Sequence, residues 1–270
     1  MTTLRLARVT DAPARGGDEA PAETTVLRRS YYLDETEVTN AQYGAFAKAT
    51  GYRTEAEVRG SDAMLNPVGG FSELEAKVSW RVPYTFQPLS PTFQREPVIK
   101  VTWADCMQFT VWVGGTLPTV SQFVRALRGG LEGQRHPWGD SDAPPRPIEN
   151  LGDAALARLG WFSRPDTTYD DGFGFIAPVR SFAPNPLGLY DLAGNVSEGC
   201  LEGASSRTDA PSGSGSKSHF ILGGDWLSAP GSVGVLTYAV LDGSGGTEGV
   251  GFRCAKTLPF DAFAEDGSPQ

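Results

Sequence analysis

The stretch NPLGLYDLAGNVSEG, residues 185–199, carries the densest structural signal in this sequence. Its apolar residues are suited to packing, and among them stand Asp191, Gly194, Asn195 and Glu198, a tightly turned and oxygen-rich set. Oxygen donors held by tight turns are what a hard cation such as Ca²⁺ prefers. The same groups are also typical of turns closed by local hydrogen bonds. The residues alone leave both interpretations open.

Upstream of this stretch, a capping box marks the start of a helix. Thr39 is followed three residues later by Gln42, and Gly51 supplies a stop. We therefore expect a helix over about residues 40–50. Its buried face would consist of Tyr43, Phe46 and Ala47.

Two more helices are expected farther along the chain. One begins after Thr102 and ends at Gly114, and its inward side chains would be Trp103, Met107 and Val111. The other begins with a capping box of Thr119 and Gln122, and its buried stripe would be Phe123, Ala126 and Leu127.

The remaining sequence predicts short strands and long irregular segments. Strands are expected in residues 26–38, in HFILGGDW (219–226) and in VGFRCAKTL (250–258). Residues 54–95 show no sustained periodicity and predict a long packed loop, and residues 205–218 predict a flexible surface loop. The expected fold class is α+β, with a small antiparallel sheet, two to three helices and much irregular structure.

Composition narrows the possible partners. The 270 residues carry a net charge of −9 with no basic run, which argues against nucleic acid as a partner. The N-terminal residues lack the apolar core of a secretory signal, and no apolar stretch approaches the roughly 18 residues of a membrane span. We expect a cytoplasmic protein by default, with display at the cell surface left open.

The cysteines do not suggest a disulfide framework or a zinc site. Cys106, Cys200 and Cys254 are far apart in the sequence, and only His136 and His219 are present to assist them. A structural zinc site needs four nitrogen or sulfur ligands, usually in close pairs. We expect three buried, inert thiols.

Several segments, in order along the chain, resemble the formylglycine-generating-enzyme (sulfatase-modifying-factor) family. The resemblance implies a single C-type-lectin-like domain over residues 1–270, with N- and C-terminal strands that lie close together. The segments are DETEVTNAQYGAF (34–46), ATGYRTEAE (49–57), PVIKVTWADC (97–106), LPTVSQF (117–123), HPWGD (136–140), PVRSFAPNPLGLYDLAGNVSEG (178–199), LGGDW (222–226) and GFRC (251–254).

The resemblance also implies structural calcium. One site would use the side chains of Asp191 and Glu198 with the carbonyls of Gly194 and Val196. A second site would use Asn150 and Asp171 with the carbonyls of Leu151 and Phe173. Neither site would be catalytic.

The chain departs from the family in one interval. Members that oxidise a sulfatase cysteine use a cysteine pair, which holds copper, between the Gly-Gly-x-Trp and Gly-Phe-Arg motifs. Here that interval, residues 225–250, contains no cysteine. Thiol oxidation needs a thiolate to bind a soft metal, so we expect no copper and predict that the chain is not an enzyme.

The same interval resembles the variable regions of diversity-generating-retroelement proteins, which use this fold to display a hypervariable binding surface. The variable region would span about residues 223–254, on a scaffold of Gly223, Gly224, Trp226, Gly251, Phe252 and Arg253. We expect a non-catalytic protein with an unknown ligand, itself a protein. The predicted ligand-binding residues are Asp225, Leu227, Ser228, Ser232, Thr237, Tyr238, Val240, Asp242 and Ser244.

Two alternatives stay open at this point. The chain could be a fixed pseudo-enzyme that serves as a binding module of the same family. It could also be an oxidase with an unrecognised site, for which Glu198, His136 and the cysteines are the candidates.

Overall fold

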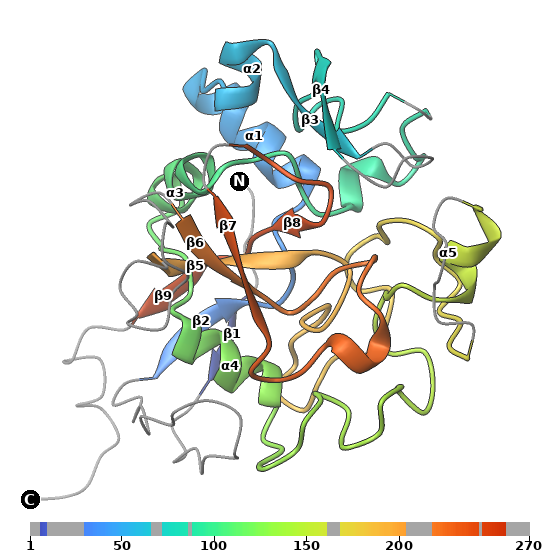
Figure 1. Cartoon of the computed structure of the whole chain (residues 1–270). Helices are drawn as coiled ribbons and strands as arrows, with labels where there is room; N and C mark the ends of the chain where they lie inside the picture. Colours follow the sequence, from blue (N-terminus) through green and yellow to red (C-terminus); the bar gives the residue numbers. More distant parts are fainter. Residues whose placement is uncertain are drawn as a thin grey trace, which may run out of the picture.

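The computed structural model describes residues 6–9, 30–65, 72–85, 88–160, 168–203, 218–242 and 245–257 (Figure 1). Helices and short strands alternate with long irregular segments, which confirms the expected α+β class. No helix in these ranges has the length and apolar character needed to cross a membrane. The loop predicted for residues 205–218 lies outside the described residues except for Ser218, which begins a strand.

A small sheet joins the two ends of the chain. Its strands are β1 (Leu6–Val9), β2 (Tyr31–Asp34) and β9 (Ala255–Thr257), in the order β1-β2-β9 and antiparallel. Strand β2 falls within the strand predicted for residues 26–38. The proximity of the N- and C-terminal strands, which the resemblance implied, is confirmed (Figure 1).

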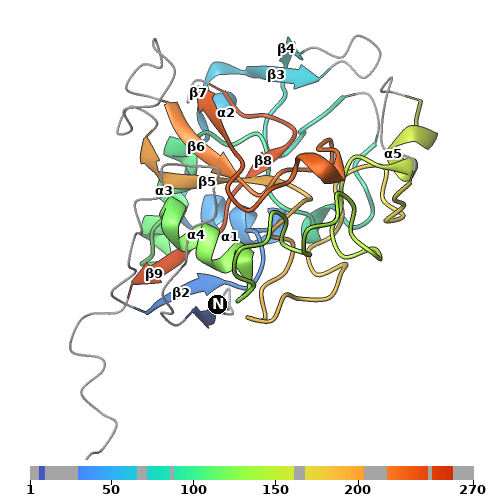
Figure 2. The same cartoon turned by 60° about the horizontal axis from the view of Figure 1, so that its bottom comes forward.

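The capping boxes identified in the sequence begin α1 (Asn40–Thr50) and α4 (Val120–Arg128). In each helix the threonine hydroxyl accepts a hydrogen bond from the backbone N–H of the glutamine. The side-chain oxygen of that glutamine in turn accepts a hydrogen bond from the backbone N–H of the threonine. Both helices bury the predicted faces. Helix α4 packs against β5 (Ser197–Gly203) and β6 (Ser218–Leu222), two strands of the larger sheet (Figure 2).

Helix α3 (Trp103–Trp112) begins after Thr102 as predicted, and its predicted inward residues Trp103 and Met107 are half-buried against the core, but the prediction for Val111 is wrong. Val111 is 68% exposed, and the helix buries Cys106 and Phe109 instead. Phe109 stacks on Tyr43 of α1. Helix α3 is apolar on nearly every side, so its sequence did not fix which face turns inward.

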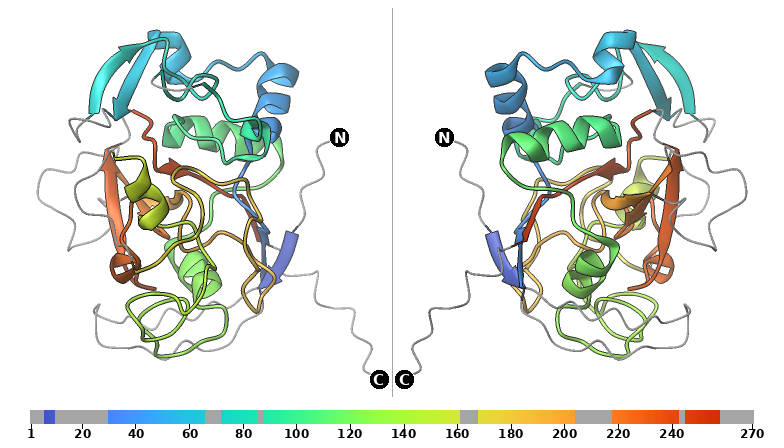
Figure 3. Two further views of the ribbon diagram at one scale, coloured as in Figure 1. Left: turned by 90° about the vertical axis from the view of Figure 1, so that its right-hand side faces the viewer. Right: turned by 90° about the vertical axis from the view of Figure 1, so that its left-hand side faces the viewer.

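The single long loop predicted for residues 54–95 is also wrong. This segment forms α2 (Glu55–Arg59), a hairpin of β3 (Ser61–Leu65) and β4 (Ser72–Ala76), and the 3-10 turn η1 (Phe93–Arg95). Figure 3 shows α2 and the hairpin together at one end of the molecule. The elements are too short for their periodicity to be seen in the sequence.

The larger sheet positions the candidate site. Its strands are β5 (Ser197–Gly203), β6 (Ser218–Leu222), β7 (Tyr238–Asp242) and β8 (Val250–Gly251), in the order β7-β6-β5-β8. Only the β5–β8 pairing among these is parallel. The predicted strand 219–226 ends at Leu222, because Gly223 and Gly224 turn the chain away. Two short elements complete the fold: α5 (Ala154–Arg158) and the 3-10 turn η3 (Pro230–Ser232).

Candidate functional site

The turn after β6 starts the interval between the Gly-Gly-x-Trp and Gly-Phe-Arg motifs. Gly223 has φ +97°, and a Cβ there would lie 2.6 Å from the carbonyl oxygen of Leu192, so only glycine fits. Trp226 then inserts into the core with 1% of its surface exposed, and its ring nitrogen donates to the carbonyl of Glu248 at 3.3 Å. The predicted scaffold role of these residues agrees with their burial.

A cleft of about 190 Å³ opens where this interval folds back over β6. Four predicted ligand-binding residues line it: Ser228, Ser232, Thr237 and Tyr238. Among the other lining residues the sequence indicated only Gly224, as scaffold, because the rest come from strand ends and from core-facing positions. The other lining residues are Ser197, Ile221, Leu222, Gly224, Val233, Gly234 and Ala239. None of the described lining residues carries a charge, and none is a cysteine.

The hydroxyl groups at the cleft differ in how tightly they are held. Ser228 donates to the Asp225 carboxylate at 2.8 Å and accepts from the Asp225 backbone N–H, so it fixes the turn. Ser232 is exposed and donates to the carbonyl of Ala229 at 2.7 Å. Tyr238 is 39% exposed, and its ring meets Phe220 edge to face. Ser232 and Tyr238 are therefore the residues best placed to meet a ligand.

The other predicted contact residues lie elsewhere or are less accessible. The carboxylate of Asp225 is held by Ser228 and by the N–H of Leu227, and burial raises the pKa of Asp225. Leu227 packs beside Trp226, and Val240 packs against the core beneath α4. Asp242 lies in β7, and neither its side chain nor Ser244 is among the described parts of the chain. Their role in binding stays a prediction.

Glu198, a predicted calcium ligand, is paired with Arg253. The Arg253 guanidinium contacts both Glu198 oxygens, at 2.7 and 2.9 Å from Nε, and both side chains are 0% exposed. It also donates to the carbonyls of Asp34, Tyr190 and Asp191. Burial raises the pKa of Glu198 in spite of this guanidinium. In the first predicted site, the Glu198 carboxylate is therefore already paired with a buried guanidinium.

The second predicted calcium set fits a cation better. Asn150 is fully buried, and its Oδ1 has no hydrogen-bond partner, while its amide donates to Phe175 and Asn195. The Asp171 carboxylate accepts the backbone N–H groups of Leu151 and Phe173, each at 2.8 Å, which brings the set together. Burial raises the pKa of Asp171 to about 7, and the neighbouring Asp153 carboxylate adds to this rise.

No cluster of three or more acidic, histidine or cysteine side chains in the described ranges has metal-site geometry. A cation at either set would therefore depend on amide and backbone oxygens, as the predicted sets do. Calcium at both sites stays a prediction.

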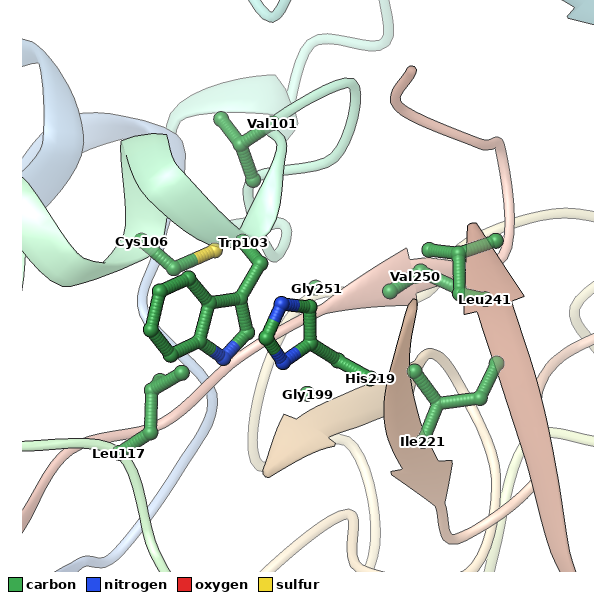
Figure 4. Close-up of a pocket in the computed structure, with 10 residues that line it drawn as sticks. All are labelled: Val101, Trp103, Cys106, Leu117, Gly199, His219, Ile221, Leu241, Val250 and Gly251. Carbon is green, nitrogen blue, oxygen red and sulfur yellow. The ribbon is translucent and has the colours of Figure 1, made fainter. Parts of the chain in front are cut away.

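A second, smaller cavity of about 20 Å³ lies between α3 and the larger sheet (Figure 4). The Trp103 and His219 rings stack in parallel beside it, with centroids 4.1 Å apart, and Cys106 lies on the α3 side. Its volume suits about one water molecule, and most of its lining is apolar.

The cysteines are buried, as predicted. Cys106, Cys200 and Cys254 are free thiols with at most 5% exposure. Burial raises the pKa of each thiol well above its usual range. A protonated, inaccessible thiol is a poor nucleophile and a poor ligand for copper.

Comparison with known proteins identifies the family. Residues 6–258 match the sulfatase-modifying factor enzyme 1-like domain, and the chain belongs to this family. It is 34% identical over 284 residues to a formylglycine-generating enzyme of Streptomyces coelicolor, covering 95% of this chain and 85% of that one. It is also 34% identical over 273 residues to the inactive C-alpha-formylglycine-generating enzyme 2 of Mus musculus, covering 92% and 82%.

The fold is C-type-lectin-like, as the sequence indicated. The solved Treponema denticola variable protein 1 superimposes with a TM-score of 0.60 and covers 94% of this chain, with 95% of its own length matched. At 16% identity this likeness concerns the fold alone.

The prediction that the chain is not an enzyme is wrong. Its relatives named formylglycine-generating enzymes place it in an enzyme family, with 34% identity along 95% of the chain in the Streptomyces coelicolor case. The prediction rested on one interval that lacks cysteine, whereas the similarity to these enzymes extends over nearly the whole chain. Named inactive paralogues show that the family contains both kinds of protein.

Proposed function

We propose that this member of the sulfatase-modifying-factor family binds a protein ligand at the cleft formed by residues 223–254, and that a retroelement diversifies this segment. One observation carries the proposal. The exposed residues Ser232, Thr237 and Tyr238 line a 190 Å³ cleft, while Trp226 and Arg253 of the same segment are buried. A rigid scaffold with substitutable surface residues is what a variable binding site requires.

The positions of Trp226 and Glu248 support the proposal that a retroelement diversifies this interval. Adenine-directed mutagenesis of Asn codons cannot produce Lys, Glu, Gln, Met or Trp. In residues 225–250 only Trp226 and Glu248 belong to that set. They are 1% and 5% exposed and are joined through the Trp226 ring nitrogen. The two residues that this mutagenesis cannot produce are therefore buried in the scaffold. The exposed residues of the interval are all of types that it can produce.

The chemistry of the cleft favours a neutral surface on the partner. Its described lining combines hydroxyl groups with Ile221, Leu222 and Val233 and carries no charge. Tyr238 supplies an exposed aromatic ring at the start of β7. Aromatic anchors of this kind usually provide most of the binding energy at protein interfaces.

Two experiments test the proposal. Resequencing the gene across a population of cells should show changes confined to codons of residues 225–250 and matched to adenines in a nearby template. An invariant segment would remove the retroelement from the proposal.

A photo-crosslinking residue at Ser232 should capture a protein that the same residue at Val58, on α2 and 68% exposed, does not capture. Equal capture at both positions would contradict the binding site.

The activity named for the relatives is a second candidate, supported by the 34% identity to the Streptomyces coelicolor enzyme. The chain would then convert a cysteine of a sulfatase to formylglycine, with the substrate held in the same cleft. The test is to incubate the protein with copper(I), oxygen and a sulfatase-derived cysteine peptide, and to trap any aldehyde with a hydrazide. Aldehyde formation above the copper-only control would establish the activity, and its absence would leave binding as the better account.

A further inference from the structure

The motif HPWGD, residues 136–140, forms a closed turn whose role the proposed function leaves unexplained. The N–H of His136 donates to the carbonyl of Gly139 at 2.9 Å, and the reverse bond measures 3.1 Å. The His136 ring stacks on Trp138 with an interplanar angle of 5°. His136 is only 3% exposed. The turn therefore presents a histidine whose ring is fixed in position.

This turn contacts one wall of the cleft through the His136 ring and the Arg135 carbonyl. The ring Nδ1 of His136 lies 2.8 Å from the carbonyl oxygen of Val233, and the N–H of Val235 donates to the carbonyl of Arg135 at 2.8 Å. Between these contacts, a Cβ on Gly234 would lie 2.7 Å from the hydroxyl oxygen of Thr237. Val233, Gly234 and Thr237 all line the cleft.

The hydrogen bond to Val233 determines the state of the imidazole. A carbonyl oxygen can only accept, so Nδ1 must carry the proton. The other nitrogen, Nε2, is buried without a hydrogen-bond partner, and the Asp142 carboxylate lies 3.8 Å away. Arg135 already contacts the same Asp142 oxygen at 3.0 Å. The contact with Val233 therefore requires a proton on Nδ1, whichever charge the ring carries.

We infer that His136 is a positioning residue for the cleft, and that its Nδ1–H fixes the Val233–Val235 wall against the turn of residues 135–142. The assignment of a role in binding rests on the proposed function, whereas the contact with Val233 does not. His136 itself is not among the described residues that line the cleft. It sets the backbone conformation that places Gly234 and Thr237 at the cleft.

The tautomer can be measured directly, because the chain has only two histidines. A two-dimensional ¹H–¹⁵N spectrum of the imidazoles at neutral pH should show one ring in the Nδ1–H form, and this signal should vanish in His136→Asn. Finding the Nε2–H form at His136 would overturn the inference. The spectrum is recorded on the unmodified protein, and the variant serves only to assign the signal to His136.

A matched pair of variants separates hydrogen bonding from packing. The amide of Asn replaces Nδ1 of histidine, while the longer Gln places its amide nearer to Nε2. Exchange of the Val235 amide proton should stay close to wild type in His136→Asn and accelerate at least tenfold in His136→Gln, with thermal midpoints measured for both. Equal exchange in the two variants would show a packing role only and would overturn the inference.

The outcomes also separate this inference from the proposed function. If the Nδ1–H form is found but a crosslinker at Ser232 captures no partner, the wall is positioned as inferred and the binding proposal fails. If the crosslinker captures a partner but His136 is found in the Nε2–H form, the binding proposal is supported and His136 has no positioning role.

Discussion

The ends and the middle of residues 223–254 are built in opposite ways. At the ends, Trp226 and Arg253 are 1% and 0% exposed, and hydrogen bonds fix both side chains. In the middle, Ser232 and Thr237 are exposed and bond only to neighbours within a few residues. The fold depends on the ends, and a ligand would meet the middle. One segment can therefore keep its backbone while its surface changes.

Replacing Arg253 with Met should have the largest effect on stability. The substitution leaves Glu198 buried without its partner, and breaking a buried pair from one side costs about 3–5 kcal/mol. We expect a loss of that order in the free energy of unfolding, measured by urea denaturation, or no folded protein at all.

An exposed ion pair provides the control for this substitution. Arg158 contacts Asp170 at 2.7 Å near α5, and both side chains are about half exposed. Arg158→Met should leave the urea midpoint unchanged. The double variant Glu198→Gln/Arg253→Met should recover part of the lost stability, and a double variant less stable than Arg253→Met would contradict the explanation.

Calcium should stabilise the protein through the set that contains Asn150 and Asp171. A ligand that binds only the folded state at about a hundredfold excess over its Kd adds ~2.7 kcal/mol to the free energy of unfolding. We expect the thermal midpoint to rise with added calcium and to fall again with a chelator. Asn150→Ala should remove the response, and an undiminished response in that variant would place calcium elsewhere.

Stability should also depend on pH through Asp34 of β2, which is 4% exposed. Burial raises the pKa of Asp34 to about 6, although the N–H of Cys254 and the charge of Arg253 oppose the shift. The folded state therefore holds this proton more tightly than the unfolded state. The contribution is fully present below about pH 4 and is lost as the pH rises through 6, a change on the order of 2 kcal/mol. Asp34→Asn should make the fall in unfolding free energy between pH 4 and 7 less steep, and an unchanged profile would contradict this account.

Sequence reasoning succeeded where a local signal determines the structure. The capping boxes at Thr39 and Thr119 fixed the starts of α1 and α4, because a hydroxyl and an amide three residues apart satisfy the free N–H groups of a first turn. A similar box at Thr54 and Glu57 begins α2, but this helix of five residues is too short to show a periodic buried face in the sequence. The inward face of α3 depended on packing with α1 and could not be derived from α3 alone.

For the candidate site, the sequence indicated the segment but not its geometry. It pointed to Ser228, Ser232, Thr237 and Tyr238, and these residues do line one cleft. It missed the wall contributed by β6 and by Ser197, because pairing between distant strands sets their proximity. It considered His136 only as a candidate of the oxidase alternative and did not indicate its contact with Val233, which spans 97 positions of the chain.

Substitutions in the middle of the segment should have the smallest effect on stability. Ser232→Ala removes a hydroxyl from an exposed side chain that bonds only to Ala229, so the free energy of unfolding should change by less than about 0.5 kcal/mol. Tyr238→Ala should cost more stability because its ring contacts Phe220, and it should also weaken capture of the crosslinked partner at least tenfold. Urea denaturation and capture yield, measured on the same preparations, test both statements. If Ser232→Ala destabilised the protein as much as Arg253→Met does, the middle of the segment would be part of the scaffold, and it would no longer be free to vary with the ligand.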